Sequence, residues 1–287
     1  MTTSPDRVPE LARRVWTRLE AVHVLAYFAP SVVAAHAALG IEDRMTSYVA
    51  GRSAPMGAVG PELVTSAFYG FAPRMIARAL PSAWDLAPPE VVLTATQTAM
   101  AELVAELAGD EPTLTEAAAL AVEAAELHPT LGRPLAAAWS GVPWSEDPAL
   151  ALWQAATRIR ESRGDGHLAL LVAQPLDGVE AHLTVRGDNE KVRNILGLLR
   201  GITAEEWDAA ADRLRDRGLL DTTGALTDAG AAVRDRLEAR TDELASPPWV
   251  TLGVDRTTAL LAALEPIVAR VLAAGIVPGV VARAATA

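Results

Sequence analysis

The stretch from 189 to 245 constrains the fold of this chain more than any other part. An apolar helix is expected to end in a short turn at 201–203, which places Thr203 at the N-cap of a second helix. Glu206 follows three residues later, so the two residues form a capping box. In such a box the threonine oxygen accepts a hydrogen bond from an otherwise unpaired amide, and the glutamate reaches back to the N-cap amide.

The second helix of this stretch has one apolar face and a defined end. Its apolar positions recur at helical spacing, at Trp207, Ala210, Ala211 and Leu214. Gly218 is suited to the position after its C-cap. Two very short strands around Gly224 and a helix from Asp228 are expected next. This is the element order of a winged helix-turn-helix. We therefore predict a mainly α, multi-helical protein with one embedded winged helix-turn-helix unit that carries a small β-hairpin.

Composition favours helices and excludes several kinds of site. Hydrophobic residues make up 51% of the 287 residues, aromatic residues only 5%, and there is no cysteine. Disulfides, thiolate nucleophiles and cysteine metal sites are therefore excluded. The five histidines form no i, i+4 pair, and no phosphate-binding glycine loop or G-x-S-x-G motif is present. No metal site is predicted and the cofactor is unknown, although a haem or metal between His23 and His167 is left open.

The charge balance argues against strong DNA binding. The net charge is −11, and residues 189–245 hold nine lysines and arginines against twelve aspartates and glutamates. Arg213, Arg215 and Arg217 are the candidate DNA contacts, but they share their helix with five acidic residues. Neutralising phosphates supplies most of the non-specific affinity for DNA, so an acidic helix is a poor partner. We expect weak or no DNA binding.

Proline and glycine clusters divide the chain into four parts. We predict an N-terminal helical part with an aromatic cluster (1–86), a second helical part (87–188), the winged helix-turn-helix (189–245) and a C-terminal helical segment (246–287). The last helix, 255–274, carries an apolar stripe at Leu260, Leu261, Leu264, Ile267 and Val271. Such a stripe favours a homodimer through this helix.

One uncharged stretch is long enough to span a membrane. It covers residues 21–41 and contains two histidines, Pro30 and many small side chains. We interpret it as a buried helical hairpin broken at Pro30, with no membrane partner. No basic, apolar leader opens the chain, so a cytoplasmic location is expected.

All three phenylalanines and all three tyrosines lie between Tyr27 and Phe71. One interpretation is an ordinary aromatic core, and the other is a ligand pocket walled by these rings, with polar groups such as Arg52 inside it. The candidate ligand-binding residues are His23, Tyr27, Tyr48, Arg52, Phe68, Tyr69, Phe71, Arg160 and His167. Burying Arg52 without a partner would be costly, which predicts a nearby carboxylate, such as Glu20, or an anionic ligand.

The polar stretch 158–167, RIRESRGDGH, is the second candidate element of a site. Gly164 is suited to a helix end and Asp165 to the N-cap of a following helix, with His167 in its first turn. A neutral imidazole beside Arg158, Arg160 or Arg163 could bind an anion or act as a base. The alternative is a capped turn with solvated arginines.

The chain carries a series of separated motifs, in this order: Trp16 with Leu-Glu-Ala-Val-His23, Tyr27-Phe-Ala-Pro30, Tyr48 to Gly57, Phe68 to Pro73, Leu80 to Trp84, Arg163 to His167, Glu206-Trp207, Arg217-Gly-Leu-Leu and Arg240 to Ala245. On these motifs the chain resembles the SalK-like helix-turn-helix family of actinobacteria over nearly its whole length. One departure is Ser31, where an acidic residue is expected. The resemblance implies a winged-helix fold and a regulator class, and no established activity, ligand or catalytic residue. Its motifs lie mostly outside the winged helix, which favours a pocket.

Three functions are consistent with these observations. The first is a small-molecule-binding protein on a winged-helix scaffold, acting as a ligand-responsive transcriptional regulator. The second is an enzyme that uses the same pocket for acid-base chemistry on a small, anionic metabolite, with His167 or His23 as base. The third is a scaffold or dimerisation protein without a pocket.

Overall fold

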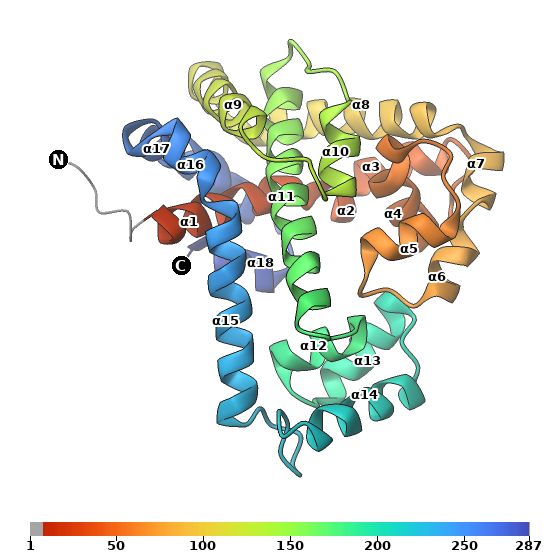
Figure 1. The fold of residues 1–287 in the computed structure, drawn as a ribbon. Coiled ribbons are helices and arrows are strands. Elements are labelled where there is room, and N and C mark those ends of the chain that lie inside the picture. Colours follow the sequence, from red (N-terminus) through yellow and green to blue (C-terminus); the bar gives the residue numbers. More distant parts are fainter. Residues whose placement is uncertain (1–7, 287) are drawn as a thin grey trace.

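The structure, a computed structural model, describes residues 8–286, which fold into helices joined by short loops (Figure 1). The predicted mainly α class is confirmed. In chain order the helices are α1 Val8–His23, α2 Leu25–Phe28, α3 Pro30–Ala37, α4 Arg44–Ser53, the 3-10 helix η2 Ala54–Met56, α5 Pro61–Phe68, α6 Pro73–Ala79, α7 Ser82–Leu86, α8 Pro89–Ala108, α9 Glu111–Glu126, α10 Pro134–Ser140, α11 Pro148–Ala173, α12 Gly178–Arg186, α13 Glu190–Arg200, α14 Ala204–Asp216, α15 Asp228–Ala245, α16 Pro247–Leu252, α17 Val254–Ala273 and α18 Gly279–Thr286.

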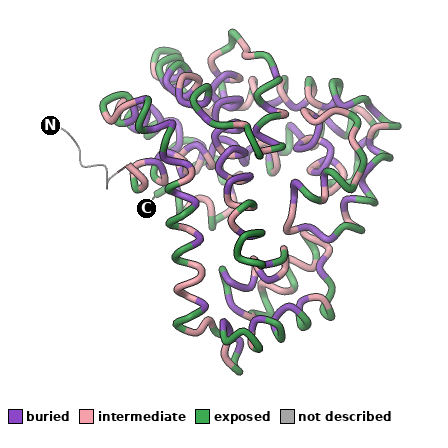
Figure 2. The backbone as a smooth tube through the Cα atoms, viewed as in Figure 1, coloured by how far each residue is buried: buried purple, intermediate pink, exposed green. Residues whose placement is uncertain are grey.

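The largest hydrophobic core lies where α1, α8, α9, α11 and α17 meet (Figure 2). Alanine permits close packing there, since Ala117, Ala121 and Ala124 of α9 have no exposed surface. Small side chains at a contact let helix axes approach each other closely. A second core joins α4, α5, α6 and α7, which we call the N-terminal lobe, and it includes Ile76 and Leu80.

The C-terminal helix α17 does not present its apolar stripe to a second copy. Leu260, Leu264 and Ile267 have no exposed surface, and the other two stripe residues are at most 9% exposed. They pack on α1, α8 and α9 of the same chain. The predicted exposure of this stripe is therefore wrong. Homodimerisation stays a prediction, but it needs another surface.

The helix-turn-helix unit consists of α13, the turn at 201–203 and α14, and it packs with α12 and α15 around a third core. The predicted capping box is confirmed: Glu206 N donates to Thr203 Oγ1 at 3.2 Å, and Thr203 N donates to Glu206 Oε2 at 2.9 Å. Trp207 is fully buried and its indole donates to Asp188 Oδ1 at 2.8 Å. Gly218 has a φ of +67°, as expected of the residue after a helix end.

The predicted β-hairpin of the wing is not formed as strands. The described residues contain one isolated antiparallel bridge, between Leu220 and Leu226. Asp221 Oδ1 closes the turn by accepting from Thr223 N at 2.8 Å and Ala225 N at 2.9 Å. Thr227 then caps α15, so the chain turns into a helix before a ladder can extend.

The long helices α11 and α15 run side by side between the main core and the helix-turn-helix unit (Figure 1). The predicted break between Gly164 and Gly166 is wrong, because α11 continues from Pro148 to Ala173. Asp165 Oδ2 accepts from Ala136 N at 3.0 Å, so it caps α10 instead of its own helix. A Cβ on Gly166 would lie 3.3 Å from Arg133 Nη1, so glycine at this position permits the approach of Arg133.

The N-terminal apolar stretch is interrupted rather than folded back. Ala29 has an extended backbone (φ −67°, ψ 129°), since a residue before proline avoids the helical region. From Pro30 the chain continues as α3, which packs mainly on α8 and not on α1. The predicted break at Pro30 is confirmed and the predicted hairpin is wrong.

Two segments, Val8–Ala37 and Pro89–Ala108, are long and apolar enough to cross a membrane by length and composition alone. Half of the tested window of the first and a third of that of the second are buried within the protein. Because core helices pass the same test, this is weak evidence for a membrane span.

Candidate functional site

Four charged side chains from α1, α4 and α11 form a largely buried network. Arg52 donates to Glu161 twice, from Nε to Oε1 at 2.9 Å and from Nη2 to Oε2 at 3.0 Å. Arg160 Nη1 donates to Glu161 Oε2 at 2.8 Å, and Arg160 Nε lies 3.7 Å from Glu20 Oε2. The predicted carboxylate partner of Arg52 is therefore present, as Glu161 rather than Glu20.

The network holds opposite charges in the interior. Burial alone would raise the pKa of Glu161, but Arg160 and Arg52 outweigh it and hold this pKa well below its usual range. Burial raises the pKa of Glu20, which Arg160 offsets only in part. A buried ion pair is stable only when each charge has its partner and its hydrogen bonds. Glu161 therefore links α4 to α11.

A chain of aromatic rings leads outward from this network. The ring centroids of His23 and Tyr27 are 5.0 Å apart, and those of Tyr27 and Tyr48 are 4.7 Å apart, both edge to face. Tyr48 stacks on Phe71 at 5.5 Å. The guanidinium carbon of Arg52 lies 4.4 Å from the Phe68 ring centroid. The structure thus brings together seven of the nine predicted ligand residues: His23, Tyr27, Tyr48, Arg52, Phe68, Phe71 and Arg160.

A cavity of about 710 Å³ adjoins this cluster, which is within the size range of small-molecule sites. Its walls come from the end of α2, from α4 and α6, and from α13 of the helix-turn-helix unit. Tyr27 and Tyr48 form its inner wall, because both also line a smaller void behind them. Two parts of the chain more than a hundred residues apart therefore share this cavity.

The void behind the two tyrosines measures about 10 Å³, room for roughly one water molecule. His36, which lines it, bonds to Ser47 at 2.7 Å and to Thr96 at 2.8 Å. His23 Nδ1 bonds to Thr157 at 3.0 Å, whereas its Nε2 has no partner among the described residues. Burial lowers the pKa of His23 well below its ordinary value, so the imidazole is neutral at pH 7. His23 is a core histidine, separated from the cavity by the tyrosines.

Tyr69 and His167, the other two predicted ligand residues, lie elsewhere. The Tyr69 hydroxyl donates to the Leu176 carbonyl, near the start of α12. His167 Nδ1 bonds to Thr241 Oγ1 of α15 at 2.8 Å, and burial lowers the pKa of His167 to about 4. His167 therefore joins α11 to α15 and does not close the aromatic pocket.

The arginines around this histidine do not form one anion site. The Arg158 guanidinium carbon lies 3.6 Å from the centroid of one of the Trp144 rings. Arg163 donates to Asp242 Oδ1 at 2.9 Å, and Arg160 belongs to the buried network. The three arginines therefore take part in three separate contacts. Of the three, only the charge of Arg163 acts on His167, where it adds to burial in lowering the pKa of the imidazole.

The two histidines considered for a haem or metal do not face each other. His23 contacts Thr157 of α11, and His167 lies ten residues further along the same helix, a rise of about 15 Å. Among residues 8–286 no group of three or more potential ligands is placed to hold a metal ion. A metal held between these two histidines has no geometric basis.

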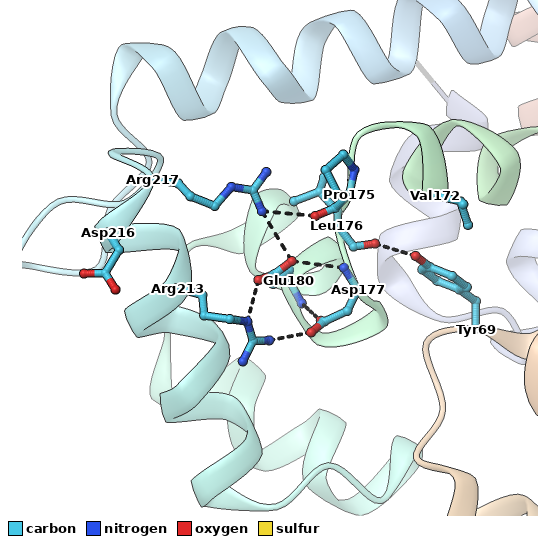
Figure 3. A pocket seen from close by; sticks show the side chains of 9 residues that line it. All are labelled: Tyr69, Val172, Pro175, Leu176, Asp177, Glu180, Arg213, Asp216 and Arg217. Carbon is cyan, nitrogen blue, oxygen red and sulfur yellow. Dashed lines mark hydrogen bonds and ion pairs between the residues drawn. The ribbon is translucent and has the colours of Figure 1, made fainter.

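The three predicted DNA contacts, Arg213 and Arg215 on α14 and Arg217 at its C-cap, are paired within the protein. Arg213 Nε donates to Glu180 Oε1 at 2.8 Å, and Arg217 Nη1 lies 3.5 Å from Glu180 Oε2 (Figure 3). Arg215 Nη2 donates to Asp188 Oδ2 at 2.6 Å. Figure 3 shows Arg213 and Arg217 pointing toward α12, across an open groove. The acidic side chains that remain exposed on α14 are Glu205, Asp208, Asp212 and Asp216.

Sequence reasoning missed the most buried charge and part of the cavity wall. Glu161 is fully buried, and its only sequence signal was a carboxylate beside Arg160 in a polar stretch that apolar sequence bounds on both sides. Arg44, Arg78 and Arg200 line the cavity. They come from three different helices, and nothing in the local sequence indicates that these helices meet.

Fold and geometry define a class of protein: an all-helical chain in which a helix-turn-helix unit and an N-terminal lobe share a small-molecule-sized cavity. A model of a helix-turn-helix family matches residues 12–278, and the chain belongs to that family. Membership suggests a DNA-binding regulator type. Comparison with curated proteins and with solved structures found no match to this chain.

Proposed function

We propose that this protein is a cytoplasmic, ligand-responsive transcriptional regulator that binds a small molecule in the cavity between α13 and the N-terminal lobe. One observation carries the proposal: the first helix of the helix-turn-helix forms part of the cavity wall. Leu198, Leu199 and Arg200 come from α13, and they face the cavity together with Met75 and Arg78 of α6. A ligand there contacts both parts of the protein at once.

Helix α13 is weakly held by the rest of the chain, which makes it responsive to a ligand. None of its residues is buried, and Leu198, Leu199 and Ile195 are 77%, 45% and 45% exposed. Segments with few buried apolar contacts open locally at little free-energy cost. A ligand with an apolar surface supplies the contacts that α13 lacks and so shifts it toward one position.

A direct connection runs from the cavity wall to α14. Ala72 N, at the start of α6, donates to the Arg200 carbonyl at 2.8 Å. Arg74 of α6 pairs with both carboxylate oxygens of Glu206, at 2.7 and 2.6 Å, and Glu206 belongs to the capping box of α14. A ligand that moves α6 relative to α13 therefore acts on the start of α14.

The DNA-binding part of the proposal rests on family membership alone. The electrostatics of α14 do not add to it, since its arginines are paired and its exposed face is acidic. We therefore propose that the free protein binds DNA weakly or not at all. The finer resemblance, to SalK-like proteins, agrees with a regulator and adds no ligand.

The proposal is tested by looking for the ligand and its effect on α13. Protein purified without denaturation is examined by native mass spectrometry and absorption spectroscopy. The compound found, or otherwise each member of a panel of organic acids, is then titrated while hydrogen exchange is measured. We expect a higher melting temperature and slower exchange in α13. The proposal is overturned when no compound co-purifies and none in the panel changes either quantity.

A matched pair of leucine variants locates the binding. Leu198 lines the cavity, whereas Leu131 is 93% exposed and lies outside it. Leu198→Ala removes apolar contact with the ligand worth about 1–2 kcal/mol, so we expect about tenfold weaker binding. Leu131→Ala should leave the affinity unchanged.

An enzyme is the second candidate, and Tyr48 is the observation that favours it. Burial opposes ionisation of Tyr48, but the guanidiniums of Arg52 and Arg200 outweigh it and lower the pKa of this phenol. Tyr48 faces the cavity, whereas His23 and His167 do not line it. Acid-base chemistry on a bound metabolite would therefore use Tyr48. Conversion of the co-purified compound by the protein, lost in Tyr48→Phe, distinguishes an enzyme from a binding protein.

A further inference from the structure

The cavity wall carries more positive than negative charge. Arg44, Arg78 and Arg200 line it with a single carboxylate, Asp43, in a chain whose net charge is −11. Within residues 8–286 none of these three arginines forms an ion pair. The arginines of α14 and its C-cap are by contrast all paired.

The one carboxylate on the wall is already engaged. Asp43 Oδ2 accepts from Thr46 N at 2.7 Å and from Thr46 Oγ1 at 2.8 Å, because Asp43 is the N-cap of α4. The hydrogen bond from the Thr46 amide is the main cause that lowers the pKa of Asp43, and the charge of Arg78 lowers this pKa further. The Asp43 carboxylate therefore stays ionised. One negative charge therefore stands against three positive charges.

Arg200 is placed to receive an anion. Its guanidinium carbon lies 3.9 Å from the centroid of the Phe71 ring, so one face of the group is fixed against an aromatic surface. Its Nε is buried and has no hydrogen-bond partner among the described residues. A guanidinium donates in its own plane, in a fork that matches a carboxylate or sulfonate. Phe71, Met75 and Leu199 provide an apolar surface next to it.

We infer that the cavity binds an organic anion, with an apolar or aromatic body against Phe71, Met75 and Leu199 and one carboxylate or sulfonate at Arg200. Arg78 and Arg44 add positive potential on the same wall. The inference rests on the proposed function and adds the chemical class of the ligand. A ligand without a hydrogen-bond acceptor would leave the buried Nε of Arg200 unpaired, which is costly, and an anionic acceptor forms the stronger bond to a guanidinium.

Two fluorescent probes with the same skeleton test this inference. 8-Anilinonaphthalene-1-sulfonate carries a sulfonate, and N-phenyl-1-naphthylamine is its uncharged counterpart. Each is titrated into the full-length protein at pH 7 and about 0.15 M salt. We expect the sulfonate probe to bind at least about tenfold more tightly, the factor for one charge-assisted contact.

Arginine variants show where the sulfonate binds. Arg200→Gln should weaken binding of the sulfonate probe about tenfold and that of the neutral probe by less than about threefold. Arg78→Gln, at an exposed position that cannot unfold the core, should weaken the sulfonate probe in the same direction. Arg186→Gln is the control, because Arg186 is exposed and lies outside the cavity. Near-ultraviolet circular dichroism verifies that each variant is folded.

The outcomes separate this inference from the proposed function. Equal binding of both probes, unchanged in the arginine variants, overturns the anion inference and leaves a small-molecule site. Preference for the sulfonate that responds equally to Arg200→Gln and Arg186→Gln means non-specific attraction and also overturns it. Failure of both probes to bind at concentrations up to about 100 μM counts against the cavity as a ligand site and so against both proposals.

Discussion

Replacing Glu161 by glutamine removes the negative charge that joins Arg52 to Arg160. The size of the side chain is kept, but three charge-assisted hydrogen bonds, at 2.8–3.0 Å, lose their anionic acceptor. Removing one partner of a buried ion pair costs about 3–5 kcal/mol, because the remaining charge stays buried without compensation. Glu20, 3.7 Å from Arg160, offsets part of this, so we expect a loss of about 3 kcal/mol.

The assay is urea denaturation at pH 7. The slope of the free energy of unfolding against urea concentration is compared between variants, since an unchanged slope shows that only stability has changed. The control is Glu243→Gln, since Glu243 pairs with Arg240 at the surface, where both side chains are at least half exposed. An exposed pair contributes about 0–1 kcal/mol. Arg52→Gln and the double variant complete a cycle, in which we expect an interaction energy of about 2 kcal/mol. A loss below about 1 kcal/mol for Glu161→Gln, or additive effects in the cycle, would refute the reasoning.

The same variant has a predicted pH dependence. The folded-state pKa of Glu161 is depressed, so its contribution to stability is complete above the unfolded value of about 4.3 and is lost as the pH falls below it. Glu161→Gln should therefore lose less stability than the unaltered protein when the pH is lowered from about 5 to about 3.

Four further outcomes are expected. Burial raises the pKa of Asp165 to about 6, so stability should fall as the pH rises from about 4 through 6, and Asp165→Asn should reduce this change in pH-dependent denaturation. Gly178→Ala places a Cβ 2.3 Å from the Tyr69 carbonyl oxygen and should cost about 1–3 kcal/mol in urea denaturation, unlike Gly141→Ala, whose nearest neighbour is at 3.4 Å. Fluorescence anisotropy at about 0.15 M salt should show no nanomolar DNA binding by the free protein, and such binding would contradict the charge argument. Light scattering should give twice the chain mass of 30.2 kDa, and a monomer mass would end the homodimer prediction.

The sequence by itself determined the features whose causes are local. The capping box of Thr203 and Glu206 and the left-handed Gly218 are both satisfied within one or two helical turns. The mainly helical class followed in the same way from composition and periodicity. The spacing of His23 and Tyr27 also placed them on one helix face, because residues four apart lie above one another.

Only the tertiary structure decided where the charges and the apolar stripes went. Whether Glu20 or Glu161 neutralises Arg52 depends on how α1, α4 and α11 cross, and that arrangement is a property of the packed core. Asp165 and Gly166 look like a helix boundary in sequence, yet α11 continues because their local role is taken over by contacts with α10 and Arg133. The stripe of α17 faces the core of its own chain for the same reason. Burial against distant segments decides between alternatives that local sequence leaves equally favourable.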